Sequence, residues 1–189
     1  MFESITRFDL SVLDMIHNSL SCGFLDRFFI IVSGLMHDGL LCMMLALVLF
    51  IIPKTRKTGL CMAFAMVFGF VFGNLIIKNA VARIRPYEFR PGIELLVSKL
   101  KDYSFPSGHT LVSFEAATVL AVREKKRFGI PALVFAVVVA FSRLYLYVHY
   151  PTDVIAGIVL GVLFGLAGCY IGGTAYGLVR DRQTGEKRN

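Results

Sequence analysis

Residues 154–179 carry no charged side chain, and this run constrains the fold more than any other feature. As a helix it is longer than the roughly 20 residues that cross a bilayer core. Further apolar runs alternate with short polar connections, and 56% of the residues are hydrophobic, which is unlike a soluble domain. The sequence predicts an all-α, polytopic membrane helical bundle forming a single domain over 1–189, with spans at about 39–52, 58–82, 107–122, 130–147 and 152–179.

The start of the chain leaves the number of spans open. The run at 39–52 is only ~21 Å long as a helix, so part of 24–38 is expected to help it cross or to re-enter. The prediction is therefore five to six transmembrane helices. Residues 1–22 space apolar side chains at helical intervals with polar residues between them, which predicts an amphipathic interfacial helix. This segment lacks a basic start followed by an apolar core, so no cleavable signal peptide is predicted.

Basic residues orient this topology. One face holds Lys54, Arg56, Lys57, Arg123, Lys125, Lys126, Arg127, Arg180, Arg182, Lys187 and Arg188. By the positive-inside rule that face is cytoplasmic, with residues 180–189 as a cytoplasmic tail. Topology thus explains most of the +7 net charge, and no nucleic-acid partner is predicted. The other face also holds cations, namely Lys78, Arg83, Arg85, Arg90, Lys99, Lys101 and Arg143, and a bound anion would account for them.

The first polar cluster on that face is Lys78, Arg85 and Pro86. Seven residues make nearly two helical turns, so on a helix Lys78 and Arg85 would share one face while Arg83 points elsewhere. Two such cations could hold a phosphate. The alternative is that both side chains extend to lipid headgroups.

The second cluster is Pro106-Ser107-Gly108-His109, directly before an apolar run. A helix start with proline before it and glycine inside it leaves backbone amides free for an anion, and Gly108 lets that anion approach closely. His109 could give a proton to a leaving group. The alternative is a capped helix with an incidental histidine at the membrane interface.

The third cluster spans residues 142–153 and joins two apolar runs. Pro151 disfavours helix at the residue before it, which puts His149 at or beside a turn and Asp153 in the first turn of the next helix. Asp153 could accept a hydrogen bond from one imidazole nitrogen of His149 and leave the other free as a nucleophile or base. Alternatively, Arg143, His149 and Asp153 merely satisfy one another. Alternating topology brings all three clusters to one side of the membrane, where they can form one site.

These clusters together resemble the three-part signature of the type 2 phosphatidic acid phosphatase superfamily, which includes lipid phosphate phosphatases. The matching residues are Lys78-x6-Arg85-Pro86, Pro106-Ser107-Gly108-His109 and Ser142-Arg143-x5-His149-x3-Asp153. The resemblance implies a phosphohistidine at His149, with Asp153 orienting it and His109 protonating the leaving oxygen. It implies that the phosphate is held by Lys78, Arg85, Ser107, Gly108 and Arg143.

The expected function is that of a small bacterial membrane lipid phosphatase whose site faces the extracytoplasmic side of the plasma membrane. The favoured substrate is undecaprenyl diphosphate, with phosphatidylglycerophosphate or phosphatidate as alternatives and residues 87–105 as the selectivity element. A lipid phosphotransferase and a lipid transporter or silent lipid-binding protein are the rival hypotheses. Cations and amides can compensate phosphate charge without a metal, so no metal and no other cofactor is expected. The sequence does not predict an oligomeric state.

Overall fold

A computed structural model describes residues 2–184, apart from the side chains at positions 2, 3, 38, 125, 126 and 182–184. Of the tail at 180–189, residues 185–189 lie outside the described part. The elements in chain order are α1 (Phe2–Leu20), α2 (Gly23–Leu35), η1 (His37–Gly39), α3 (Leu40–Ile51), α4 (Arg56–Phe68), η2 (Gly69–Ile77), α5 (Lys78–Val81), η3 (Pro86–Phe89), α6 (Gly108–Arg123), α7 (Lys125–Tyr145) and α8 (Pro151–Thr184).

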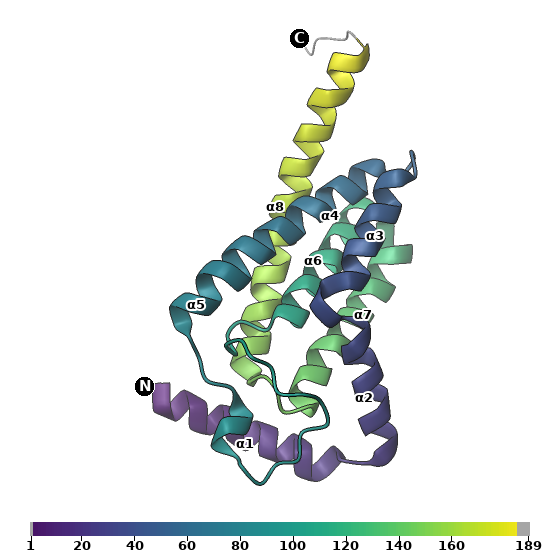
Figure 1. Cartoon of the computed structure of the whole chain (residues 1–189). Coiled ribbons are helices and arrows are strands. Elements are labelled where there is room, and N and C mark those ends of the chain that lie inside the picture. The colour runs from purple at the N-terminus through teal and green to yellow at the C-terminus, as the bar shows by residue number, and fades with distance from the viewer. Residues whose placement is uncertain (1, 185–189) are drawn as a thin grey trace.

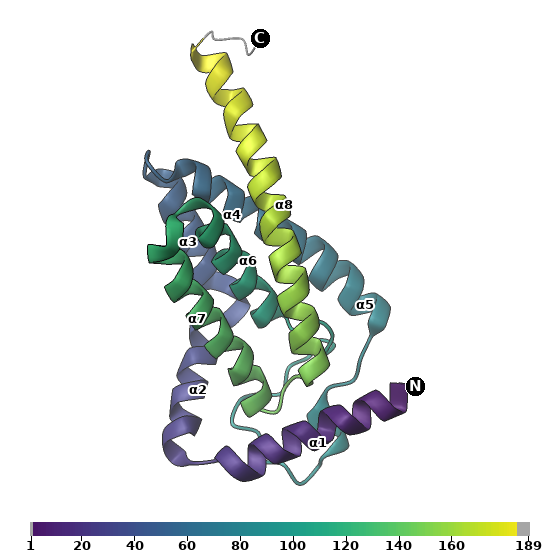
Figure 2. The same ribbon diagram turned by 180° about the vertical axis from the view of Figure 1, so that it is seen from behind.

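The bundle is built around α6, which packs against α8, α7 and α4 (Figures 1 and 2). Small residues on α8 allow this close packing. A side-chain carbon added at Gly161 would lie 2.6 Å from the carbonyl oxygen of Leu111 in α6, and one at Gly168 would lie 2.6 Å from the carbonyl oxygen of Cys61 in α4. The small-residue pattern of α8 therefore forms a packing surface.

Within the described part of the chain, three helical stretches are long and apolar enough to cross a membrane, and they cover Arg56–Phe89, Arg127–Tyr145 and Pro151–Asp181. The first joins α4, the π-helical η2 and α5 into one rod. A fourth candidate is the pair α2 and α3, which is bent by 49° between the two helices. Helix α6 is shorter, with 16 residues, and lies inside the bundle. A total of five to six spans stays a prediction.

Helix α1 lies across one end of the bundle, where the connection between α5 and α6 crosses it (Figures 1 and 2). Leu10, Leu13 and Ile16 on one of its faces are buried, whereas Phe8 and Met15 are 66% and 60% exposed. One face of the helix thus packs on the bundle, and its other apolar side chains are left exposed, as the predicted position at a membrane interface requires.

The same end of the bundle gathers the polar clusters. The α5 helix ends at Val81, and Ala82 adopts a left-handed backbone with φ 48°. Arg85 follows in extended backbone. The expectation that Lys78 and Arg85 share one helical face is therefore wrong. The two residues meet because the chain turns back after the helix.

Candidate active site

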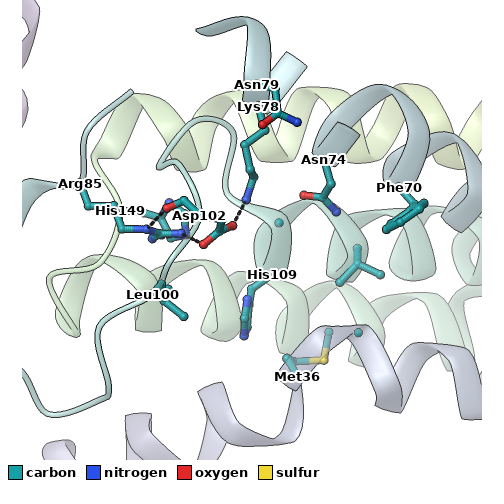
Figure 3. Close-up of a pocket in the computed structure, with 13 residues that line it drawn as sticks. Met36, Phe70, Asn74, Lys78, Asn79, Arg85, Leu100, Asp102, His109 and His149 are labelled. Atoms are coloured by element: carbon teal, nitrogen blue, oxygen red, sulfur yellow. Dashed lines mark hydrogen bonds and ion pairs between the residues drawn. The ribbon is translucent and has the colours of Figure 1, made fainter. Parts of the chain in front are cut away.

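All three polar clusters meet at one cavity of about 380 Å³ (Figure 3). Its wall includes residues from α5, the 82–107 connection, the start of α6 and the α7–α8 turn, among them Lys78, Arg85, Gly108, His109 and His149. This volume is within the range of small-molecule sites. The two histidines belong to the same cavity, so the predicted convergence is confirmed.

His149 lies in the turn between α7 and α8, as its place before Pro151 predicted. The Arg85 guanidinium is 3.3 Å from its Nε2, and Arg85 Nη1 also donates to the carbonyl oxygen of Val148 at 2.7 Å. Because a guanidinium can only donate, this contact assigns Nε2 as an acceptor and puts the ring proton on Nδ1. The nitrogen that faces the cavity is therefore the unprotonated one, and its lone pair accepts from Arg85 in this state.

The Nδ1 of His149 faces Asp153 Oδ2 at 3.6 Å. This separation is longer than a hydrogen bond, so the interaction is electrostatic in this state. Asp153 is fully buried, and its Oδ2 accepts from Ser104 Oγ at 2.5 Å and from the Tyr150 backbone N–H at 3.1 Å. These donors fix the carboxylate beside the imidazole, in the first turn of α8 as predicted.

Burial lowers the pKa of His149 to about 3. The nearby charge of Asp153 raises this pKa, but burial and the positive charges of Arg85 and Arg143 outweigh that effect. The imidazole is therefore neutral at physiological pH, which is the form that has a lone pair to donate.

A carboxylate occupies the space between the two cations (Figure 3). Asp102 Oδ2 lies 2.5 Å from Lys78 Nζ, and its Oδ1 lies 2.7 Å from Arg85 Nη2. Burial raises the pKa of Asp102, but hydrogen bonds and charges from Lys78 and Arg85 outweigh it and lower that pKa to about 2. The sequence placed Asp102 in the selectivity loop and gave no signal of this pairing.

Three of the predicted site residues lie behind the cavity wall. Ser107 is fully buried, with its Oγ 2.9 Å from Thr110 Oγ1, and Asp153 stands behind His149. Arg143 donates to Ser33 Oγ and lines a second cavity of about 660 Å³, which shares His109 with the first. Arg143 and His109 thus line this second cavity together.

Sequence reasoning missed Arg83. Its Nη1 donates to Asp153 Oδ1 at 2.6 Å, so it contacts the carboxylate that faces His149 instead of pointing away from the site. A helical wheel could not find this contact, because Arg83 lies beyond the end of α5. Within the described residues, no three His, Cys, Asp or Glu side chains are grouped so that they could hold a metal ion.

Residues 41–176 match the sequence profile of the PAP2 superfamily. The chain belongs to this superfamily. It is 40% identical over 113 residues to an undecaprenyl-diphosphatase of Sulfolobus acidocaldarius, and the aligned region covers 60% of this chain and 54% of that protein. It is 34% identical over 147 residues to phosphatidylglycerophosphatase B of Bacillus subtilis, covering 70% of each chain.

The fold agrees with this membership. The crystal structure of a transmembrane PAP2-type phosphatidylglycerolphosphate phosphatase from Bacillus subtilis superposes with a TM-score of 0.73 at 24% identity, covering 90% of this chain and 87% of the other. The predicted superfamily and the predicted all-helical fold are confirmed, and the PAP2 chain described here is an integral membrane protein. It spans about half the length of the Sulfolobus relative.

Proposed function

We propose that this protein is a lipid phosphatase that hydrolyses a phosphate monoester or diphosphate of a lipid through a phosphohistidine, with undecaprenyl diphosphate as the favoured substrate. One observation carries the proposal. A neutral histidine presents an unprotonated Nε2 beside Arg85 in a cavity shared with Lys78 and His109. A nucleophile, a proton carrier and cations around one anion-sized space are the components that phosphoryl transfer needs.

In the first step, the Nε2 lone pair of His149 attacks phosphorus. The bond from phosphorus to the leaving oxygen breaks, and its electron pair stays on that oxygen. This oxygen takes a proton from the His109 imidazolium, a form that the negative charge of the bound phosphate would stabilise. The imidazole becomes a phosphorylated cation, and the negative charge of Asp153 opposite Nδ1 stabilises it. A lipid alcohol or lipid phosphate leaves.

In the second step, a water molecule attacks the phosphohistidine while His109 takes one of its protons. The bond from phosphorus to Nε2 breaks, and its electrons return to the nitrogen as a lone pair. Inorganic phosphate leaves, and both histidines regain their starting protonation states. Lys78, Arg85, Gly108 and the backbone amides that begin α6 would hold the phosphoryl oxygens during both steps. Ser107 and Arg143 would support them from behind the wall.

Two considerations support a lipid substrate at the extracytoplasmic face. The relatives' names include an undecaprenyl-diphosphatase and a phosphatidylglycerophosphatase, so both substrates are candidates. The site lies at the end of the bundle opposite the basic turn between α3 and α4 (Figure 1), and the positive-inside rule assigns that turn to the cytoplasm. We therefore infer a site on the outer face of a bacterial plasma membrane.

The deciding experiment uses purified protein in detergent with a panel of undecaprenyl diphosphate, phosphatidylglycerophosphate and phosphatidate, labelled with ³²P in the terminal phosphate. We expect release of inorganic phosphate and an acid-labile phosphoprotein after rapid quenching. The variant His149→Ala should lose both while still inserting and folding. Transfer of label to an added lipid acceptor would instead indicate a phosphotransferase. Lipid transport retained by His149→Ala would indicate a transporter and contradict the proposal.

A further inference from the structure

One guanidinium joins the N-terminal helix to the catalytic turn. Arg83 Nη2 lies 2.8 Å from Asp9 Oδ2 in α1, and Arg83 Nη1 lies 2.6 Å from Asp153 Oδ1 in α8. Both carboxylate side chains are fully buried, and the Arg83 side chain is 17% exposed. Buried charges in contact are costly to separate, since removing one partner leaves the other uncompensated. This three-residue bridge therefore holds its members in one arrangement.

Further contacts tie the same bridge to the start of α8. Asp9 accepts from Thr152 twice, from the hydroxyl at 2.5 Å and from the backbone N–H at 3.3 Å. The backbone contact caps one of the amides that begin α8, a task that a residue at the helix start itself usually performs. The Arg83 guanidinium also lies over the Tyr150 ring, 3.7 Å from its centroid. Two residues before Asp153 are thus held in place, Thr152 by Asp9 of α1 and Tyr150 by Arg83.

We propose that Arg83 and Asp9 are positioning residues that set the Asp153 carboxylate, and through it His149, for phosphoryl transfer. The inference rests on the proposed function. Asp153 divides its contacts, because Oδ2 faces His149 and Oδ1 bonds to Arg83. Without Arg83 the buried Oδ1 would lose its cation, and only the two donors to Oδ2, Ser104 and the Tyr150 backbone N–H, would hold the carboxylate beside the imidazole. Helix α1 carries none of the signature residues, yet through Asp9 and Arg83 it would help to hold Asp153 in place.

A second contact between α1 and the rest of the chain provides a matched control. Arg90 Nη2 lies 2.9 Å from Asp14 Oδ2, and the Tyr147 hydroxyl donates to Asp14 Oδ1 at 2.5 Å. This pair joins α1 to the 82–107 connection in a similar way, but it contacts neither His149 nor Asp153. Loss of helix docking and loss of catalytic positioning can therefore be separated.

The test compares Arg83→Gln, Asp9→Asn and Arg90→Gln on the best lipid phosphate from the substrate panel. We expect Arg83→Gln to lower kcat by about 10- to 100-fold with KM changed less than about threefold, since misplaced catalytic groups affect the reacting complex. Asp9→Asn should lower kcat in the same direction by a smaller factor. Arg90→Gln should leave the acid limb of the pH profile at its wild-type position.

The pH profile is the readout that a purely structural role would not move. The charged or titratable groups near His149 are Lys78 from α5, Arg85 and Asp102 from the connection, His109 from α6, Arg143 from α7 and Asp153 from α8. Removing Arg83 leaves the Asp153 charge less compensated, so a proton on His149 is held more strongly. The acid limb of kcat/KM should therefore shift to higher pH, by about one unit.

Conservative and double variants sharpen the result. Arg83→Lys keeps the charge but lacks the planar fork that reaches Asp9 and Asp153 from two nitrogens. Its kcat should therefore lie between those of Arg83→Gln and the wild type. Asp9→Asn combined with Arg83→Gln should be no slower than Arg83→Gln alone, because the two residues act through one bridge. If Arg83→Gln does not fold, as judged by gel filtration in detergent, Asp9→Asn decides by its lowered kcat with KM little changed.

Two failures are distinguishable. A wild-type protein that releases no phosphate and forms no phosphohistidine contradicts the proposed function. A folded Arg83→Gln variant with wild-type kcat and an unshifted acid limb, in a protein that does release phosphate, overturns only the positioning role.

Discussion

Lys78 Nζ lies 2.5 Å from Oδ2 of Asp102, in the space where the proposed function puts a phosphate. Arg85 holds the other oxygen of the same carboxylate. Asp102 thus occupies the position of the anion in the state described here. Its pKa of about 2 means that it stays ionised throughout the physiological range. A substrate phosphate must therefore compete with Asp102 for the two cations.

Replacing that carboxylate should tighten anion binding. We expect Asp102→Asn to lower the inhibition constant of orthovanadate, a phosphate analogue, by about 3- to 10-fold, since the competing Asp102 carboxylate is half exposed and the energy of its ion pair is modest. The matched control is Asp26→Asn, which changes the net charge equally but removes only a partner of the Tyr145 hydroxyl. An unchanged or raised inhibition constant for Asp102→Asn would contradict competition.

Substitution of His109 should separate the two chemical steps. His109→Gln removes the proton donor and the base, so hydrolysis of a lipid monoester should fall by about 10²- to 10⁴-fold. A leaving group such as p-nitrophenolate needs little protonation, so with p-nitrophenyl phosphate the first step should survive better than the second. Phosphohistidine should then accumulate and be visible after rapid quenching. Equal loss of both steps without accumulation would argue against the dual role.

The state of His149 predicts an unusual pH dependence. Burial lowers its pKa from an ordinary value near 6.5 to about 3, so the native protein keeps it neutral where the unfolded chain takes up a proton. As pH falls from about 6.5 toward 3, the unfolded chain gains that proton and the native state loses stability. NMR of labelled imidazoles should show no titration of His149 between pH 5 and 8. A midpoint near 6.5 would contradict this environment.

Chelation tests whether protein cations suffice. Lys78 and Arg85 line the cavity and can compensate phosphate charge themselves. We expect phosphate release to persist after dialysis against EDTA and to change less than about twofold when Mg²⁺ is added. Activity that EDTA abolishes and a divalent ion restores would contradict the expectation.

The helices and their order along the chain could be predicted from the sequence, because the length of an apolar run and the position of a motif can be read directly from it. The α6 and α8 bounds fall close to the predicted runs, and a proline two residues after His149 placed that residue in its turn. What the sequence could not supply depends on tertiary placement. Arg85 lies outside the helix because the backbone at Ala82 is left-handed and ends α5. Asp102 reaches Lys78 only because the 82–107 connection folds back over the site.

The contacts of Arg83 show the same limit more clearly. It bridges Asp9 and Asp153, which lie far apart in sequence and come together only when α1 crosses the end of the bundle. Helical spacing assigns a direction to a side chain only while the helix lasts, and α5 ends before Arg83. No periodicity in residues 1–22 distinguishes a buried aspartate from an exposed one.

Close packing of α8 on α6 should limit substitution at Gly161. An added Cβ would lie 2.6 Å from the carbonyl oxygen of Leu111 and 2.7 Å from the Cβ of Phe114, so the helices must move apart. We expect Gly161→Ala to lower the free energy of unfolding by about 1–3 kcal/mol. Gly34→Ala in α2 is the control, because nothing lies within 4 Å of its added carbon and alanine favours helix by up to about 1 kcal/mol. In detergent, Gly161→Ala should unfold at a lower temperature than Gly34→Ala. Equal unfolding midpoints for the two variants would contradict a packing role for Gly161.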